Sequence, residues 1–132
     1  MRYFQFLFFI LVLSLCFYGH ANAKPISVSD HDTVIVITPF PNPTDPPIPR
    51  SPAVVPISAQ YDSFASSVFL TFTSNLGEIE VEVMNTTNGY YDSGDILTLT
   101  LYAIIPISGG SGHYIITFTL SSGQQYRGEF DK

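Results

Sequence analysis

Apolar and polar residues alternate at every second position through most of the chain from residue 57 to its end. A period of two places successive side chains on opposite faces of a β-strand. The clearest run is Ile79 to Val83, in which two glutamates separate three apolar residues. No stretch after Ala23 has the spacing of apolar residues that a helix requires. The pattern therefore predicts an all-β domain.

Seven such runs are predicted to be strands, separated by turn residues such as Asn88-Gly89, which suits a tight hairpin. Their ranges are 57–61, 68–73, 79–84, 90–91, 97–103, 114–120 and 126–130. Short antiparallel strands in this number are typical of an immunoglobulin-like β-sandwich. Tyr114, at the start of the sixth run, suits the tyrosine corner of that fold. We predict such a sandwich over residues 57–132.

The alternation also predicts which side chains fill the interior. Leu99, in the fifth run, and Phe118, in the sixth, lie on interior registers, whereas Thr98 lies on the outer one. Truncation of either interior residue to Ala is expected to cost about 2–5 kcal/mol. The change Thr98→Ala is expected to cost less than about 1 kcal/mol.

Residues 1–23 have the features of a signal peptide. Met1 and Arg2 precede an apolar run from Phe4 to Tyr18, and the segment ends in an A-x-A motif at Ala23. The apolar run is shorter than the ~20 residues of a membrane-spanning helix. We expect cleavage after Ala23 and export to the periplasm, the cell surface or the medium, with no stable membrane span remaining.

Cys16 raises the alternative of a lipoprotein signal. Leu15 stands before it where a small residue is needed, and Phe17 and Tyr18 follow, which disfavours lipidation. Removal of residues 1–23 leaves no cysteine, so neither a disulfide framework nor a thiol nucleophile is available. It also leaves four Lys/Arg against eleven Asp/Glu, a net charge of −7. Such a chain repels phosphate backbones, which excludes nucleic acid as a partner.

Residues 24–56 are predicted to be an extended tail and a Pro-rich linker. Eight of the ten prolines lie between Pro39 and Pro56, and proline fixes φ and lacks a backbone donor. Ahead of them, the β-branched run 33–38 favours a strand. This run pairs either with the domain or with a partner.

Several motifs occur in an order that resembles a family of short secreted proteins from gut Gram-negative anaerobes. They are Arg50-Ser51 before Pro56-Ile57-Ser58-Ala59, Val68 to Phe72 leading into Asn75-Leu76-Gly77, Gly112-His113-Tyr114, and Tyr126 to Phe130. The resemblance covers residues 50–132. That family is a domain of unknown function with an immunoglobulin-like sandwich, so the resemblance implies a fold and export without a known activity or site.

Two short motifs in the tail add hypotheses. Asp32-Thr33-Val34 matches the three-residue pattern at which these bacteria O-glycosylate exported proteins, which makes Thr33 a candidate modification site. Pro41-Asn42-Pro43 resembles the start of the sorting domains that type IX secretion recognises. Those domains continue directly with a strand and follow a cargo domain, and neither feature is present here.

Two clusters of charged residues invite a metal site. Glu78, Glu80 and Glu82 share one strand face at a spacing of about 6.6 Å, whereas Ca²⁺ requires six to eight converging oxygens. The triplet Asp30-His31-Asp32 lies in the tail, without a shell to orient the ligands. We therefore interpret both clusters as solvated surface and expect no metal and no cofactor.

Ser111 and His113 suggest nucleophilic catalysis, but no third residue is identified to orient the histidine. The loop 108–112 suggests an anion-binding nest, yet it precedes a strand, so that no helix dipole assists. A turn explains it more simply. The protein is therefore not expected to be an enzyme.

Aromatic residues at outward positions are the candidate binding site. Phe69 and Tyr102 lie on outward registers of two runs that neighbour each other in an immunoglobulin-type sheet, and Ile96 and Ile104 are expected to join them, with Tyr91 extending the patch. The leading hypothesis is an exported, non-catalytic binding or interaction module of the cell envelope, with a glycan or a protein as its ligand. The first alternative is a pilus-like or matrix subunit that pairs through its tail strand, and the second is the sorting-like domain.

Overall fold

The computed structural model describes residues 32–41 and 54–132, which form nine strands and one short 3₁₀ helix. In chain order these are β1 (Asp32–Ile35), β2 (Thr38–Phe40), β3 (Ile57–Asp62), β4 (Ser67–Phe72), β5 (Glu78–Asn85), β6 (Tyr91–Leu97), η1 (Thr98–Thr100), β7 (Tyr102–Pro106), β8 (His113–Leu120) and β9 (Gln125–Asp131). The expected signal peptide with its cleavage site at Ala23, the residues Cys16, Asp30 and His31, and most of the Pro-rich linker lie outside the described residues.

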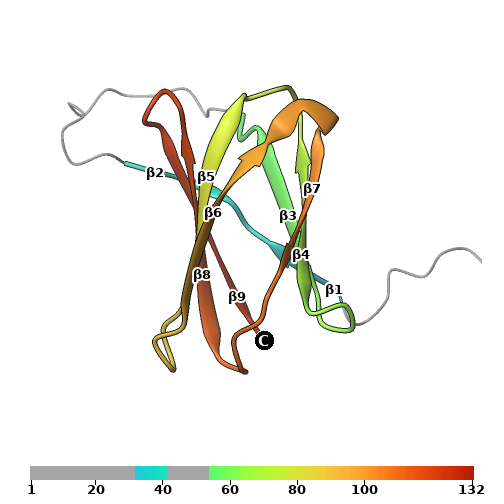
Figure 1. The fold of residues 1–132 in the computed structure, drawn as a ribbon, viewed down its shortest axis with the longest axis vertical. Coiled ribbons are helices and arrows are strands. Elements are labelled where there is room, and N and C mark those ends of the chain that lie inside the picture. The colour runs from blue at the N-terminus through green and yellow to red at the C-terminus, as the bar shows by residue number, and fades with distance from the viewer. Residues whose placement is uncertain (1–31, 42–53) are drawn as a thin grey trace, which may run out of the picture.

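The strands form two antiparallel sheets that face each other (Figure 1). One sheet has the order β1-β3-β4-β7, and the other has the order β2-β9-β8-β5-β6. The prediction of an all-β antiparallel sandwich is confirmed. In the part of the chain that the structure describes, no helix has the length and apolar character that a membrane crossing requires.

The interior is built from the registers that the alternation predicts. On β5, Ile79, Val81 and Val83 are buried, and on β8 Ile116 and Phe118 are completely buried. Aromatic rings tie the two sheets together. The Phe130 ring lies between Tyr61 of the first sheet and Tyr114 of the second, with centroid distances of 4.8 Å and 5.2 Å.

Tyr114 is the tyrosine corner that the sequence predicts, because its hydroxyl donates a hydrogen bond to the Gly110 carbonyl four residues upstream. The neighbouring Asn85 side chain is completely buried. Its amide nitrogen lies 3.3 Å from the Gly110 carbonyl, and its oxygen accepts a hydrogen bond from the backbone of Thr87. The glycine–serine loop 108–112 is therefore held by two side chains that reach it from β5 and β8.

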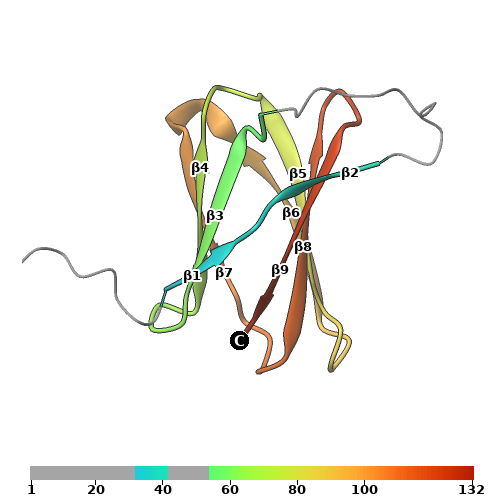
Figure 2. The same cartoon turned by 180° about the vertical axis from the view of Figure 1, so that it is seen from behind.

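Residues 32–40 belong to the sandwich, which differs from the expectation of a tail that ends at residue 56. β1 pairs with β3 in one sheet, and β2 pairs with β9 in the other. Figure 2 shows this cyan segment crossing diagonally from one sheet to the other. The open question about the β-branched run 33–38 is thereby answered, since it pairs within its own chain.

Gly128 of β9 explains how this segment fits so closely. A Cβ atom at position 128 would lie 2.5 Å from Cγ2 of Ile35 and 2.6 Å from Cδ1 of Ile37. Both isoleucines are buried. The missing side chain of Gly128 therefore provides the space in which the segment between β1 and β2 packs.

The single strand expected over residues 97–103 is a wrong prediction. Leu97 ends β6, Thr98–Thr100 form η1, and the chain then enters β7 in the other sheet. Thr98 is completely buried and Leu99 is 69% exposed, so the expected inner and outer positions are reversed. β6 itself is longer than the short edge strand predicted at residues 90–91, because it continues through Ser93-Gly94-Asp95.

Local hydrogen bonds cause this change of direction. The Thr98 hydroxyl lies 2.9 Å from the Gly77 carbonyl and accepts a hydrogen bond of 2.7 Å from the Leu76 amide. Leu101 then adopts the left-handed conformation, with φ of 58°. These bonds hold Thr98 inside the turn after β4. Leu97 and Leu99 beside it remain largely exposed, and Leu101 is exposed to a smaller extent.

Candidate functional site

The outer side of the sheet β1-β3-β4-β7 is the candidate site, and it is called here the four-strand face. Its residues are those that point away from the core on the four strands: Asp32, Val34, Ser58, Gln60, Asp62, Phe69, Thr71, Tyr102 and Ile104. Register places Val34 opposite Gln60, Gln60 opposite Phe69, and Phe69 opposite Ile104. One row of side chains therefore crosses the whole sheet.

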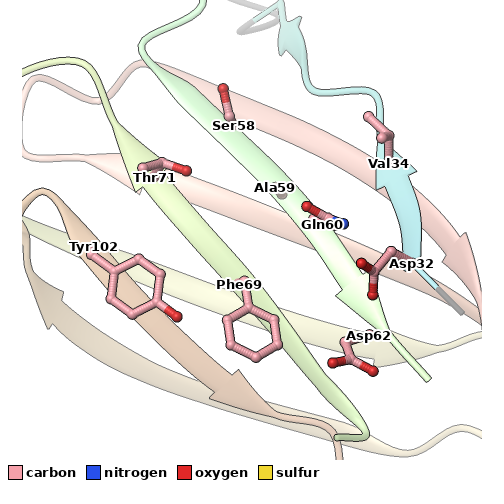
Figure 3. Close-up of a pocket in the computed structure, with 9 residues that line it drawn as sticks. All are labelled: Asp32, Val34, Ser58, Ala59, Gln60, Asp62, Phe69, Thr71 and Tyr102. Carbon is pink, nitrogen blue, oxygen red and sulfur yellow. The ribbon is translucent and has the colours of Figure 1, made fainter. Parts of the chain in front are cut away.

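Phe69 of β4 and Tyr102 of the edge strand β7 form an aromatic pair on this face. Their ring centroids are 6.3 Å apart, with an interplanar angle of 37°. Tyr102 is 46% exposed, and Phe69 is half-buried. Figure 3 shows both rings nearly face-on above β4 and β7. The pair that the sequence predicts is therefore assembled, although the strand that carries Tyr102 is β7.

Aliphatic and polar side chains surround the two rings. Val34 is 75% exposed at the β1 edge, and Ile104 is half exposed at the β7 edge. A shallow depression of about 460 Å³ lies between β1 and β7, and its polar lining includes Ser58, Gln60 and Asp62 (Figure 3). The face thus combines ring faces with hydroxyl, amide and carboxylate groups.

The two carboxylates of the face lie at one end of it, where Asp32 pairs with Asp62 across β1 and β3. The Asp62 carboxylate also accepts hydrogen bonds from the backbone amides of Phe64 and Ala65, at 2.8 Å and 3.1 Å. It therefore orders the turn between β3 and β4. The residues that line the depression include no cation, so the face is neutral at its centre and negative at one end.

Tyr91 lies elsewhere. It belongs to β6, at the edge of the other sheet, and its hydroxyl donates a hydrogen bond of 2.6 Å to the Glu82 carboxylate. This bond is the main cause that raises the pKa of the Tyr91 hydroxyl. Ile96 is on β6 as well, where it pairs with Ile79 and is partly buried. The structure therefore joins Phe69 and Tyr102 with Ile104. Ile96 meets Ile104 only in a second depression between β6 and β7, and Tyr91 lines neither depression.

Thr33, the candidate O-glycosylation site, is exposed on the edge strand β1, where it pairs with Tyr61 of β3. Its neighbours Asp32 and Val34 belong to the four-strand face. Thr33 itself has the opposite register, because its partner Tyr61 points into the core.

The polar clusters that the sequence raised lie apart from this face. Glu80 and Glu82 point outward from β5 in the second sheet, as expected. Among residues 32–41 and 54–132, no group of three His, Cys, Asp or Glu side chains is arranged to hold a metal ion. Asp30 and His31 lie outside that part of the chain.

His113 has carboxylates as partners at both ring nitrogens. Its Nδ1 lies 2.8 Å from Asp131 and its Nε2 lies 3.5 Å from Glu129. The hydrogen bond with Asp131 is the largest of the effects that raise the pKa of the imidazole above its ordinary value of 6.5. This arrangement favours a charged surface histidine, whereas a general base for Ser111 would need a free nitrogen that faces the hydroxyl.

Val34, Gln60 and Asp62 are contributors to the face that sequence reasoning missed. Gln60 and Asp62 occupy outward registers of a strand whose interior residues were recognised, so the alternation within 57–62 was a usable signal. Val34 could not be placed, because nothing in the run 33–38 says which strand it joins.

No family model matches this chain, and no curated protein sequence matches it. The crystal structure of a DUF3244 family protein with an immunoglobulin-like β-sandwich fold from Bacteroides vulgatus ATCC 8482 is similar in fold. The two share 15% sequence identity with a TM-score of 0.58, and the match covers 76% of this chain and 98% of the other. The fold is therefore an immunoglobulin-like β-sandwich, and the solved neighbour agrees with the resemblance to a domain of unknown function.

Proposed function

We propose that this protein is an exported, non-catalytic binding module of the cell envelope and that the four-strand face contacts its ligand, a glycan or a protein. The pair formed by the half-buried Phe69 ring and the exposed Tyr102 ring is the observation that carries the proposal. An apolar patch on an outer sheet face costs solubility and contributes little to the core, so it is typical of a contact surface.

The chemistry of the face supports this proposal. Ring faces stack against sugar rings and against apolar side chains. The hydroxyl of Ser58 and the amide of Gln60, both in the same depression, supply hydrogen-bond donors and acceptors. Tyr102 also has a hydroxyl group on its apolar ring. Such a side chain suits a surface that contacts water in the free protein and a ligand in the complex.

The double variant Phe69→Ser with Tyr102→Ser tests the proposal. Binding of the purified domain to an envelope fraction from its own organism is measured beside the melting temperature. We expect binding to fall at least about tenfold, as for the loss of central contact residues, with a melting temperature within a few degrees of the parent.

The matched control is Tyr91→Ser with Leu99→Ser, which removes two exposed apolar side chains outside the four-strand face. It should bind like the parent. A large fall in melting temperature for the Phe69 and Tyr102 variant would mean that the rings are covered within the protein. Unchanged binding would reject the four-strand face as the contact surface.

Export after cleavage at Ala23 is part of the same proposal. Intact-mass measurement of the secreted protein should give a chain that begins at Lys24, whereas a diacylated species that begins at Cys16 would reject it. A mass increment removed by Thr33→Ala would identify Thr33 as the modified residue. A secreted chain without any such increment would remove Thr33 as a glycosylation site.

The structural-subunit alternative requires residues 33–38 to pair with a neighbouring molecule. In the described structure β1 and β2 are already paired with β3 and β9. That role would therefore need their release, which the burial of Ile35 and Ile37 opposes.

A further inference from the structure

The flank between the edge strands β6 and β7 has an opening in the core. A depression of about 190 Å³ lies there, lined by buried Val81 and Val83 of β5 together with residues of both edge strands. An apolar cavity of about 150 Å³ holds one benzene molecule, so this space accommodates one large apolar side chain. The depression and its rim on β6 and β7 are called here the flank groove.

Gly94 is the reason that the groove exists. It pairs with Val81, which points into the core, so a side chain at position 94 would point inward as well. A Cβ atom there would have no heavy atom within 4 Å. Gly94 is also not among the glycines with positive φ, so its backbone conformation is open to other residues.

Neither steric crowding nor backbone conformation requires glycine at this position. Glycine in a strand interior costs stability, because it loses more conformational freedom than other residues and packs nothing. Gly94 therefore leaves the edge strand without a side chain over Val81 and Val83, which stay buried at the floor of the depression, and this space is open to a side chain from outside.

The groove borders a free sheet edge. β6 is the last strand of its sheet in the part of the chain that the structure describes, and it pairs on one side only, with β5. Its unpaired backbone N–H and C=O groups are a template for an added strand. A strand added at β6 would place alternate side chains into the groove beside Gly94.

The charges around the groove specify the other set of side chains. Asp95 and Ser93 point outward on β6, opposite Glu80 and Glu82 of β5. Asp95 is on the outward register, whereas Asp92 lies opposite Val83 on the register that faces the groove, and the lining includes no lysine or arginine. The outward side chains of an added strand would therefore lie beside a negative surface.

We infer that the flank groove receives an extended segment of a partner protein, in which apolar side chains alternate with basic ones. The segment adds to the β6 edge by backbone hydrogen bonds, one apolar side chain fills the space above Gly94, and the basic side chains lie along Asp95, Glu80 and Glu82. This site adjoins the four-strand face, because Ile104 of β7 lies at the border of both.

The test uses a fluorescent peptide as long as β6 that alternates lysine with valine. Binding to the exported domain is followed by fluorescence anisotropy. One control peptide carries glutamate in place of lysine, and another carries proline in place of the central valine, which removes a backbone donor. We expect each control to bind at least about tenfold more weakly, the equivalent of one lost anchor.

Gly94→Leu fills the groove from within and should weaken binding of the lysine–valine peptide by about tenfold. Ser121→Leu, at an exposed position in the turn between β8 and β9, is the matched control and should stay within about twofold. Amide hydrogen exchange on adding the peptide should slow across Tyr91–Leu97, which reports the site independently of the substitutions.

Three results would each overturn the inference. The lysine peptide and the glutamate peptide could bind equally well, the Gly94→Leu variant could bind the lysine peptide as the parent does, or the protection from hydrogen exchange could fall on another strand edge. Gly94→Leu that only raises the melting temperature would show that the groove is a packing defect. Self-association of the parent that Gly94→Leu abolishes would assign the groove to a second copy instead.

Discussion

The two sheets of this sandwich present very different outer surfaces. The outer side of the β2-β9-β8-β5-β6 sheet carries charged residues across its width, among them Glu80, Glu82, Arg127 and Glu129. Two of these form an ion pair, in which Nη2 of Arg127 lies 3.1 Å from Oε1 of Glu129. The Cζ atom of Arg127 also lies 5.8 Å from the centre of the Phe40 ring. The four-strand face instead carries aromatic, aliphatic and uncharged polar residues across its width and charges only at one end.

The difference shows that the apolar–polar alternation along a strand predicts the buried residues well but says little about the character of the exposed surface. Both sheets bury the same kinds of side chain, such as Leu70 in one and Ile79 in the other. The two sheets differ only in their outward residues. Those of one sheet include ion pairs, whereas those of the other include the rings of Phe69 and Tyr102. Function is therefore to be sought where the outer register departs from polar residues.

The largest expected effect separates interior from exterior with the same residue type. Phe118→Ala removes a completely buried ring and should lower the free energy of unfolding by about 3–5 kcal/mol. Phe69→Ala removes a half-buried ring and should cost about 1 kcal/mol. Urea denaturation of both variants measures the difference. Equal losses would mean that the four-strand face is covered like a core, and the comparison of the two surfaces would fail.

A second effect tests the junction where the chain passes from one sheet to the other. Thr98→Ala removes a buried hydroxyl that bonds to Leu76 and Gly77, and the unsatisfied amide should cost about 1–3 kcal/mol. Leu99→Ala, at an exposed position, should stay within about 0.5 kcal/mol. The order is the reverse of that expected from the sequence. If Leu99→Ala lowered the free energy of unfolding more than Thr98→Ala did, the single strand predicted over residues 97–103 would be correct instead.

The smallest effect concerns the charged surface. Because Asp131 and Glu129 raise the pKa of His113, the folded state binds the proton more tightly than the unfolded state. The resulting stability is present below the ordinary value of 6.5 and is lost as pH rises through the raised value. His113→Gln should therefore lose stability relative to the parent at pH 6 but not at pH 9. An NMR titration of His113 at or below 6.5 would contradict this expectation.

The sequence was a sufficient guide wherever one local pattern determined the outcome. Ile79, Val81 and Val83 alternate without interruption, and Tyr114 stands where its corner requires it, so the interior of the second sheet was predictable. Phe69 and Tyr102 were placed on a common outer face because each lies one position away from a recognisable interior residue.

The errors arise where a local pattern has more than one structural solution. Leucine at positions 97, 99 and 101 keeps a period of two through a 3₁₀ turn, and only the distant bonds of Thr98 to Leu76 and Gly77 show that the strand ends. Tyr91 was assigned to the wrong surface because sheet membership of an edge strand depends on topology. The empty space beside Gly94 could not be predicted from the sequence. A glycine is equally consistent with a turn, with a site where a side chain would clash, and with a site where the space is left empty.

The segment that crosses between the sheets also sets an order of events during synthesis. Thr38 and its partner Arg127 are 89 residues apart in the chain, so β2 waits for β9, whereas β1 pairs with the much nearer β3. A contact this remote closes a long loop and slows folding. Until β9 has left the ribosome, β2 has no neighbour and Ile37 has no Gly128 to pack against. The formation of β9 is thus the step that allows β2 to pair and the segment between β1 and β2 to pack.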